Sequence, residues 1–407
     1  EGYLFQQPEA VLIARRPEEV MPVLAEVQRA TDRGLCAAGF LTYEAGGGFD
    51  SAMQTHPADD LNIPLAWFGV FRSPEEIAVP DSDDGAGFRT GTWQPTMSAQ
   101  QHAAAVGRIK DYLRSGDTYQ VNYTFRLRTS FGGDPWSLFC RIQRNQAAKY
   151  ASFIETDRFA VCSASPELFF SLDGNTLLSK PMKGTSGRGL TTRQDAELAS
   201  RMKSSAKEKA ENVMIVDMVR NDMGRIAEPE TVEASRMFEI EQYPTVLQMV
   251  STVSCRTPAG LPEIMKALFP CASITGAPKI RTMQIIRELE LGARGIYTGC
   301  IGYVLPGRQA RFNVAIRTVL VDKASATAEY GVGGGIVWDS DAGNEYRECL
   351  VKSEVLTAER QRFDLLETLL WDGAKGYFLL EEHLVRLAGS ATYFGFAADL
   401  GKVRDHL

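Results

Sequence analysis

The chain has 407 residues, of which 44% are hydrophobic and 23% are charged, and its formal net charge is −7. This composition is typical of a soluble globular protein, and the acidic balance excludes the basic surface that nucleic-acid binding requires. No run approaches the ~18 apolar residues that span a bilayer, and no signal-peptide pattern opens the chain, so we expect a cytoplasmic protein without a membrane partner. The seven cysteines include no CxxC pair, which argues against a zinc site and a disulfide framework.

The first hundred residues predict short strands broken by turns, with a glycine bend at residues 46–48. Ser98 is a fair N-cap for a helix of about 17 residues that ends at Gly116. The next segment, YQVNYTFRLRTSF, alternates between apolar and polar side chains and predicts a strand. Its polar face could line a cleft and consists of Gln120, Asn122, Thr124 and Arg126.

The rest of the chain mixes strands and helices. Residues 159–185 predict strands joined by a DGN turn, and residues 190–226 predict a helix in two pieces. Further helices are expected at 261–269, 277–290 and 344–359, and further strands at 294–305, 311–321 and 328–338. Short turns between strands favour antiparallel pairing, so we predict an α+β fold of large antiparallel sheets with helices outside.

The character of the sequence changes after residue 356. The charged segment Thr357–Arg362 is a candidate linker between a domain at 1–356 and a final piece at 363–407. That final piece is too short to complete a domain of its own.

Two glutamate pairs carry the first chemical signal. Glu208 and Glu211 are three residues apart on one expected helix, and Glu345 and Glu348 are three apart on another. Each pair therefore lies on one helical face. Such pairs are usually solvated, but two such faces meeting would need a cation, and an all-oxygen set suits Mg²⁺.

Glycine-rich stretches, an arginine and a lysine loop carry the second signal. The glycines in residues 272–279, 297–303 and 330–340 either allow tight sheet packing or cradle an anion with backbone N–H groups. Arg317, expected on an apolar strand, would hold a carboxylate or phosphate. Lys183 follows Pro181 and Met182 in SKPMKGTSGRG, which by itself fits a solvated turn. Together these features suggest a site for a small polycarboxylate.

Eight motifs in order then resemble a known family: GDTYQVNYTFRL, SASPELFF, KPMKGTSGRG, KAENVMIVDMVRNDMGRI, ASITGAPKIRTMQIIRELE, YTGCIGY, AIRTV and GGGIVWDSDAGNEYRECLVK. They are similar to the chorismate-utilising enzymes, and most similar to the branch formed by component I of the aminodeoxychorismate synthases. The resemblance covers roughly residues 35–356. It implies two large antiparallel sheets packed face to face around the active site.

The resemblance also implies roles for single residues. Glu211 and Glu348 would hold Mg²⁺, with Glu208 and Glu345 helping through water, and the metal would bind the ring carboxylate of chorismate. Glu167 would protonate the departing ring hydroxyl. The remaining substrate contacts would come from Thr275, Tyr297, Arg317, Lys352 and the backbone of Gly333, Gly334 and Gly335.

Lys183 separates the branches of the family. Anthranilate-forming relatives carry alanine there, whereas in the aminodeoxychorismate enzymes this lysine is the proposed nucleophile that attacks ring carbon C2. Attack needs a neutral amine, which burial and nearby cations such as Mg²⁺ and Lys180 would favour. Gln120 supports the same branch, because water-adding relatives carry a lysine there to activate water.

The resemblance implies 4-amino-4-deoxychorismate, a precursor of p-aminobenzoate and folate, as the product of chorismate and ammonia. No glutaminase motif is present, so nitrogen would come from a glutamine amidotransferase subunit or from free ammonia. Anthranilate synthase component I and a catalytically silent scaffold subunit are the alternatives. Many relatives have histidine at the position of Gln248, whose effect stays open, as does a tryptophan site in the N-terminal part.

Residues 363–407 resemble the start of a fold-type IV pyridoxal-phosphate enzyme such as aminodeoxychorismate lyase. Arg386 in HLVRL corresponds to the phosphate-binding arginine of that family. The lysine that would form the Schiff base would lie beyond Leu407, so we expect no lyase activity from this chain.

Overall fold

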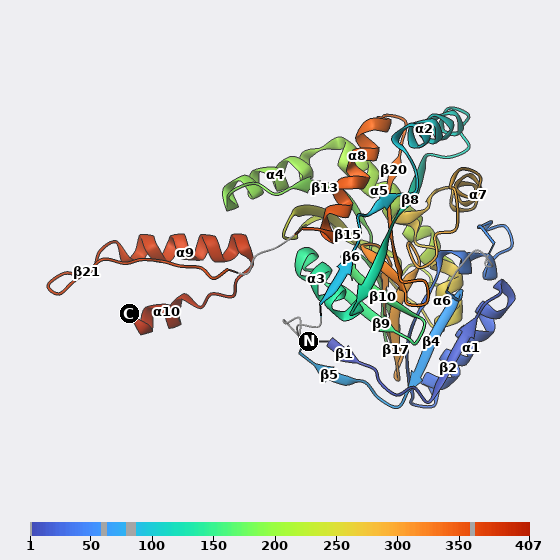
Figure 1. Ribbon diagram of the computed structural model, residues 1–407, viewed down its shortest axis with the longest axis horizontal. Coiled ribbons are helices and arrows are strands. Elements are labelled where there is room, and N and C mark those ends of the chain that lie inside the picture. The colour runs from blue at the N-terminus through green and yellow to red at the C-terminus, as the bar shows by residue number, and fades with distance from the viewer. Residues whose placement is uncertain (1, 58–62, 79–86, 359–362) are drawn as a thin grey trace.

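Two antiparallel sheets form the centre of the protein in a computed structural model that describes residues 2–57, 63–78, 87–358 and 363–407 (Figure 1). The eight-stranded sheet has the order β16-β8-β20-β19-β10-β9, and β6 and β7 also pair with β8. Its strands are β6 (Phe88–Thr90), β7 (Gln94–Pro95), β8 (Gln120–Gly133), β9 (Tyr150–Glu155), β10 (Phe159–Ser165), β16 (Gly276–Ala277), β19 (Thr318–Asp322) and β20 (Thr327–Ile336).

The ten-stranded sheet has the order β13-β15-β12-β11-β18-β17-β3-β4-β2, and β14 also pairs with β15. Its strands are β2 (Ala10–Ala14), β3 (Cys36–Leu41), β4 (Ala66–Phe71), β11 (Leu168–Asp173), β12 (Thr176–Lys180), β13 (Met182–Gly187), β14 (Glu233–Gln242), β15 (Val246–Arg256), β17 (Cys300–Leu305) and β18 (Gln309–Val314). The strand β13 carries Lys183 and ends this order.

Helices cover the outer faces of both sheets, because each sheet has an apolar face that must be buried. The ten-stranded sheet packs on α1 (Pro17–Asp32), α5 (Ala206–Gly224) and α6 (Leu261–Leu268). The eight-stranded sheet packs on α2 (Ala99–Arg114), α3 (Pro135–Gln146), α7 (Lys279–Leu289) and α8 (Ala342–Ser353). Short 3₁₀ turns are η1 (Tyr43–Gly48), η3 (Ala272–Ile274) and η4 (Glu354–Leu356).

A third apolar cluster joins the two sheets. It contains Phe40 of β3 and Ile301 of β17 from one sheet, and Phe159 and Val161 of β10 from the other. The predicted α+β fold of large antiparallel sheets is confirmed. No helix in the described part of the chain is long and apolar enough to cross a membrane.

Two of the differences between the local predictions and the structure concern α1 and Arg317. The segment expected to hold only strands contains α1, whose buried stripe includes Val20, Leu24 and Val27. The expected strand at 311–321 is interrupted, and Arg317 lies between β18 and β19 with φ +53°. The prediction of Arg317 on a strand is therefore wrong. By contrast, Ser98 caps α2 as predicted, through a hydrogen bond of 3.3 Å from Gln101 N.

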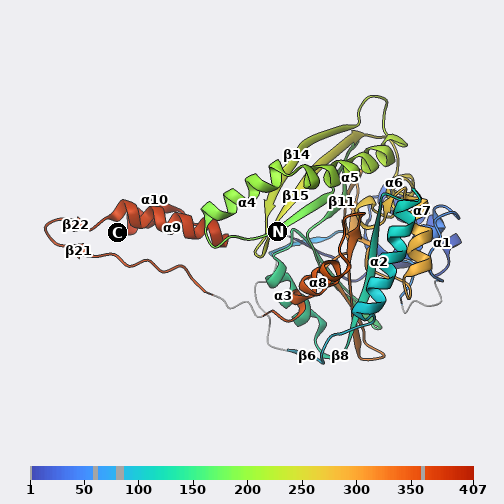
Figure 2. The ribbon, with the colours of Figure 1, turned by 90° about the horizontal axis from the view of Figure 1, so that it is seen from above.

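Residues 363–407, called the tail below, extend away from residues 2–358, called the body (Figures 1 and 2). The tail contains β21 (Trp371–Asp372), β22 (Gly376–Tyr377), α9 (Leu380–Phe394) and α10 (Leu400–His406). The last turns of α9 meet α4 (Thr192–Ser204) of the body. Within the body, β1 (Gly2–Leu4) pairs with β5 (Glu75–Ile77). Most of the expected linker, 359–362, lies outside the described residues.

Candidate functional site

Lys183 lies at an irregularity in strand β13. The pairing of β13 with β15 is regular from Thr185 to Gly187 but shifts register between Met182 and Thr185. Gly184 has φ +99°, a conformation that other residues rarely adopt, and a Cβ there would overlap the carboxylate of Glu208. The glycine after Lys183 is thus required by the backbone and by the neighbouring helix α5.

The amine of Lys183 points to the eight-stranded sheet. A methyl group on residue 335 would lie 2.5 Å from Nζ of Lys183 and 3.2 Å from the amide nitrogen of Gln120. Burial lowers the pKa of Lys183; the Glu211 carboxylate opposes that effect and the Lys352 cation adds to it. Lys180, which we had expected to assist, lies instead near Glu241, at 4.0 Å.

The glycines of β20 allow this close approach. Gly333 accepts a hydrogen bond of 2.8 Å from Nζ of Lys352, and a Cβ on Gly334 would lie 3.2 Å from Oε2 of Glu345. At Gly331 a Cβ would overlap the ring of Tyr297. Tight sheet packing therefore applies at Gly331, Gly335 leaves room for the amine of Lys183, and the cradle for an anion stays a prediction.

The four predicted glutamates come from two helices that face the same region. Glu208 and Glu211 lie on α5, and Glu345 and Glu348 lie on α8. Burial and the Glu211 carboxylate raise the pKa of Glu208, and the Glu348 charge also contributes. Burial opposes ionisation of Glu348, but Lys352 at 2.9 Å outweighs burial and holds its pKa below the usual range.

Across residues 2–57, 63–78, 87–358 and 363–407, no three acidic, histidine or cysteine side chains are close enough to form a metal site as they stand. The donor set nevertheless fits a hard divalent cation. It is all carboxylate, and the pKa of Glu208 is raised first by burial and then by the neighbouring Glu211 carboxylate. A cation with oxygen ligands would relieve that repulsion.

Glu167 is buried between strands β10 and β11. Its Oε1 accepts a hydrogen bond of 2.6 Å from the hydroxyl of Ser273, a residue that the sequence did not single out. Burial raises the pKa of Glu167 to about 7, although Ser273 and the Lys183 cation both act to lower it. A carboxyl group with this pKa is protonated often enough near neutrality to act as a general acid.

Gln120 is fully buried, and neither its amide oxygen nor its amide nitrogen has a hydrogen-bond partner. An unpaired buried amide is costly, so a group of this kind beside Lys183 points to a ligand. Thr275 is also buried, but its hydroxyl donates to the carbonyl of Cys271 at 3.1 Å and thereby fixes its own turn.

Arg317 and Tyr297 both have partners within the protein. Arg317 donates through Nη1 to the carbonyl of Lys352, which ties the β18–β19 break to helix α8. The ring of Tyr297 is buried, 5.1 Å from the guanidinium carbon of Arg126. The structure therefore brings together Lys183, Gln120, Lys352 and the glycines, and gives Thr275, Tyr297 and Arg317 supporting contacts.

A buried charge network that the sequence reasoning missed holds these segments together. Arg294 forms an ion pair of 2.7 Å with Glu290 and donates to the carbonyls of Asn122 at 2.6 Å and Ile274 at 2.9 Å. Its own N–H and that of Gly295 donate to Glu44, at 2.7 Å and 2.9 Å. The i, i+4 spacing of Glu290 and Arg294 was the available signal, but helical surfaces share it.

The comparisons with known proteins agree with this geometry. The family of chorismate-binding enzymes matches residues 3–358. The chain belongs to this family. It is 40% identical to aminodeoxychorismate synthase component 1 of Klebsiella aerogenes over 296 residues, which are 72% of this chain and 63% of that protein. It is 35% identical to the protein of the same name in Escherichia coli strain K12 over 297 residues, again 72% and 63%.

The chain thus spans less than two thirds of the length of these chorismate-binding relatives. Its fold is similar to the crystal structure of anthranilate synthase component I from Streptococcus pneumoniae, with a TM-score of 0.77 at 24% identity. That similarity covers 88% of this chain and 92% of the other, and at such identity it concerns the fold alone.

Gln248 has two structural contacts here. Its Nε2 donates to the carbonyl of Gly184 at 2.9 Å, and its Oε1 accepts from the hydroxyl of Thr185 at 2.8 Å. Both contacts fall on the segment directly after Lys183. Gln248 therefore holds the irregular part of β13 against β15.

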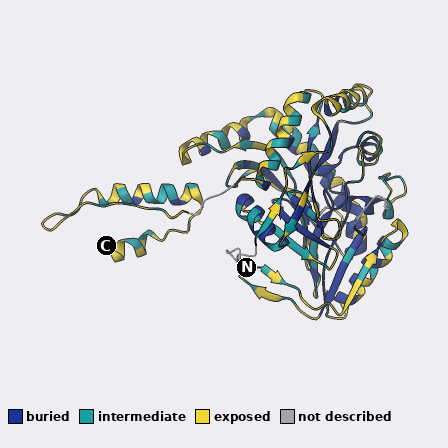
Figure 3. Ribbon diagram, viewed as in Figure 1, coloured by how far each residue is buried: buried dark blue, intermediate teal, exposed yellow. Residues whose placement is uncertain are grey.

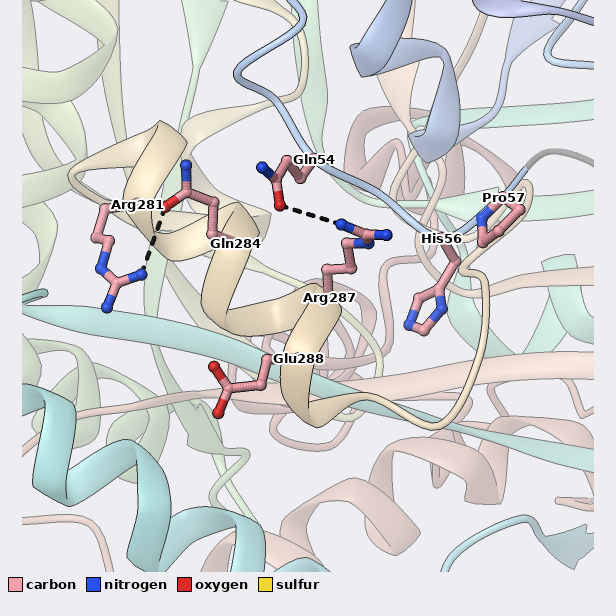
Figure 4. A pocket seen from close by; sticks show the side chains of 7 residues that line it. All are labelled: Gln54, His56, Pro57, Arg281, Gln284, Arg287 and Glu288. Atoms are coloured by element: carbon pink, nitrogen blue, oxygen red, sulfur yellow. Dashed lines mark hydrogen bonds between the residues drawn. The ribbon is translucent and has the colours of Figure 1, made fainter.

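A surface pocket of about 600 Å³ between residues 54–57 and α7 takes no part in this arrangement (Figure 4). Its charged groups already have partners: Arg281 pairs with Asp117 at 2.9 Å, and Glu288 with Arg108 at 3.3 Å. Arg287 donates to Gln54 at 3.1 Å. The pocket is lined by Gln54, His56, Pro57, Arg281, Gln284, Arg287 and Glu288.

Proposed function

We propose that the chain is the synthase component of an aminodeoxychorismate synthase, which converts chorismate and ammonia to 4-amino-4-deoxychorismate and water. The observation that carries the proposal is the amine of Lys183, whose pKa is lowered and which approaches Gly335 and the unpaired amide of Gln120. The names of the relatives at 40% and 35% identity support the same activity.

In the proposed reaction the neutral amine of Lys183 forms a bond to ring carbon C2 while the C4 hydroxyl departs. Glu167 gives its proton to that hydroxyl, which leaves as water. Ammonia then bonds to C4 and the lysine nitrogen leaves C2, which restores the free amine. Division into two displacements lowers the barrier of each one, and the buried amide of Gln120 would bind a polar group of the reactants.

The glutamates of α5 and α8 would hold Mg²⁺, with Glu211 and Glu348 as ligands and Glu208 and Glu345 in support. The cation would supply positive charge for the ring carboxylate of chorismate. Lys352 already places a cation beside Gly333 and Glu348, and the backbone N–H groups of β20 lie at the same place.

The test is to incubate the protein with chorismate, Mg²⁺ and ammonium and to identify the product by mass. Lys183→Met is expected to lower product formation at least about 100-fold, equivalent to ~2.7 kcal/mol of barrier. Lys180→Met is the matched control, because this lysine lies three residues away and near Glu241. Equal loss in both variants, or none in Lys183→Met, would remove Lys183 from the mechanism.

Ammonium replaces the partner in this assay. We propose that a glutamine amidotransferase subunit normally supplies ammonia, which the "component 1" names of the relatives support. Formation of anthranilate and pyruvate would establish the alternative, an anthranilate synthase component. Absence of any Mg²⁺-dependent turnover of chorismate would favour a silent scaffold subunit.

A further inference from the structure

The tail contacts the body where the last turns of helix α9 meet helix α4, and Tyr393 makes polar contacts with the body at this end of α9. The hydroxyl of Tyr393 donates to the carbonyl of Gly189 at 2.7 Å. In return, Nη2 of Arg188 donates to the carbonyl of Tyr393 at 3.0 Å, and the guanidinium carbon of Arg188 lies 4.6 Å from the centre of the tyrosine ring. Three different interactions therefore converge on the same two neighbouring residues of the body.

The body builds the receiving site from buried charged groups. Arg188 and Asp195 are only 8% and 9% exposed and form an ion pair of 2.6 Å. Nη1 of Arg188 donates to the carbonyl of Tyr243 at 2.9 Å, and Oδ1 of Asp195 accepts from the N–H of Gly189 at 2.8 Å. A guanidinium held in this way presents its remaining N–H in a fixed direction, which suits a single carbonyl acceptor.

This receiving site lies directly after the strand that carries Lys183. Strand β13 ends at Gly187, and Arg188 is the next residue. Among the described strands β13 pairs with β15 alone, and the pairing is irregular at Lys183. An edge strand with a bulge is weakly held, so its ends decide how well its register is fixed. Gln248 holds the segment after the bulge, and Arg188 holds the far end.

We propose that helix α9 is an intramolecular partner of the active site, and that Tyr393 positions Lys183 by docking on Arg188 and Gly189. Tyr393 is a positioning residue here, since its hydroxyl and its ring contact the segment that follows β13. The inference rests on the proposed function only insofar as Lys183 is the reacting amine. The docking itself is independent of which reaction the site performs.

The docking is tested by hydrogen exchange of the amides in residues 182–190 of the full chain. Tyr393→Ala removes the ring and the hydroxyl, and we expect exchange in this segment to accelerate about tenfold. Tyr393→Phe removes only the hydroxyl, and a smaller acceleration of about threefold is expected from one lost hydrogen bond. The matched control is Tyr377→Phe, whose hydroxyl donates to the Leu407 carbonyl at 2.9 Å within the tail. Unchanged exchange at 182–190 in Tyr393→Ala would overturn the proposal.

A second readout concerns the amine itself. Covalent labelling of Lys183 by trinitrobenzenesulfonate, followed as a function of pH, reports how far the pKa of this amine is lowered. We expect Tyr393→Ala to move the labelling profile toward that of an ordinary lysine, while the profile of Lys180 stays the same. If Lys183 keeps the wild-type labelling profile in Tyr393→Ala, the docking of the tail does not position Lys183, even where exchange shows that the tail has detached.

The two proposals fail in different ways. If the wild-type chain makes no 4-amino-4-deoxychorismate, but Tyr393→Ala changes the exchange and the labelling as expected, the proposed function is rejected and the docking is supported. If Tyr393→Ala aminates chorismate as well as the wild type does and its amide exchange is unchanged, the proposed function is supported and the docking is rejected. Arg188→Lys keeps the charge but loses the fork, and it should reproduce the effect of Tyr393→Ala on exchange.

Discussion

The body and the tail use charged and apolar side chains in opposite ways. The body buries large apolar clusters on both sheets and places charged groups such as Glu44, Glu167 and Arg294 among them. In the tail only Leu384 and Ala391 are buried, and most side chains face the outside (Figure 3). Burial raises the pKa of Glu44 and Glu167 in the body, whereas hydrogen bonds lower the pKa of Glu367 in the tail.

This difference shows why a site of the proposed kind belongs to the body. A neutral lysine and a protonated glutamic acid near neutrality both require removal from water, because desolvation disfavours the charged form. Glu167 has such surroundings, with a pKa of about 7. In the tail, hydrogen bonds from Arg386 and His383 lower the pKa of Glu367 to about 2, so that carboxylate stays ionised.

The substitution with the largest expected effect tests whether the catalytic acid lies in the body or in the tail. Glu167→Gln keeps the hydrogen bond from Ser273 but cannot give up a proton, so kcat for amination should fall about 10²–10⁴-fold. Glu381→Gln is the same change in the tail, at the exposed ion pair with Arg404, and kcat should be unaltered. Steady-state kinetics at saturating chorismate and ammonium measure both. Comparable kcat values for wild type and Glu167→Gln would remove Glu167 as the acid.

A second pair of substitutions tests the energetic side of the comparison. Arg294→Met leaves Glu290 buried without its ionic partner and should lower the free energy of unfolding by about 3–5 kcal/mol. Arg404→Met breaks the exposed pair with Glu381, and the urea midpoint should stay where it is. Urea unfolding followed by tryptophan fluorescence measures both. A small effect of Arg294→Met would mean that water replaces the guanidinium in the network.

The pH dependence of stability between pH 5 and pH 8 should differ between the two regions. Burial raises the pKa of Glu44 to about 7, from 4.5 in the unfolded chain. Its contribution is therefore fully present below about pH 4.5 and is lost as the pH rises to about 7, because only the unfolded state releases the proton. Between pH 5 and pH 8 wild type should lose on the order of 3 kcal/mol relative to Glu44→Gln.

For Glu367 the pKa is lowered to about 2, so its contribution is present above about pH 4.5 and is lost as the pH falls through about 2. Protection of tail amides should therefore be constant from pH 5 to pH 8 and should fall in Glu367→Gln at every pH in that interval. Urea unfolding measures the stability of the body, and amide exchange measures the stability of the tail, so the two pH profiles can be recorded separately. Parallel pH profiles in both regions would break the comparison.

The sequence predicted what local patterns determine. Ser98 caps its helix and residues 120–127 form a strand as expected, and the helix expected at 190–226 is in two pieces, since caps and periodicity depend on neighbours in the chain. Helix α1 was missed, because only short strands broken by turns were expected in the first hundred residues. Pro17 occupies the first helical turn, where proline is tolerated.

The buried network around Arg294 could not be predicted from the sequence, for a different reason. Glu44 and Arg294 meet across 250 positions of sequence, and nothing local distinguishes a buried arginine from an exposed one. Likewise the sequence offered Lys180 and Lys183 together, and only the bulge in β13 decides which amine faces Gly335. The motifs placed the main residues of the candidate site, and tertiary contacts supplied Ser273, Glu290 and Arg294.

The smallest expected effect concerns the apolar side chains of the tail. Val385 on α9 is 71% exposed, so Val385→Ser should change the free energy of unfolding by no more than about 0.5 kcal/mol. Val161→Ser, at a valine buried between the two sheets, should cost about 2 kcal/mol or more, because a methyl group is lost and a hydroxyl is buried. Urea unfolding of both variants measures the two changes in the free energy of unfolding. A large cost for Val385→Ser would show that this face of α9 is covered in solution, and the tail would then be a packed region like the body.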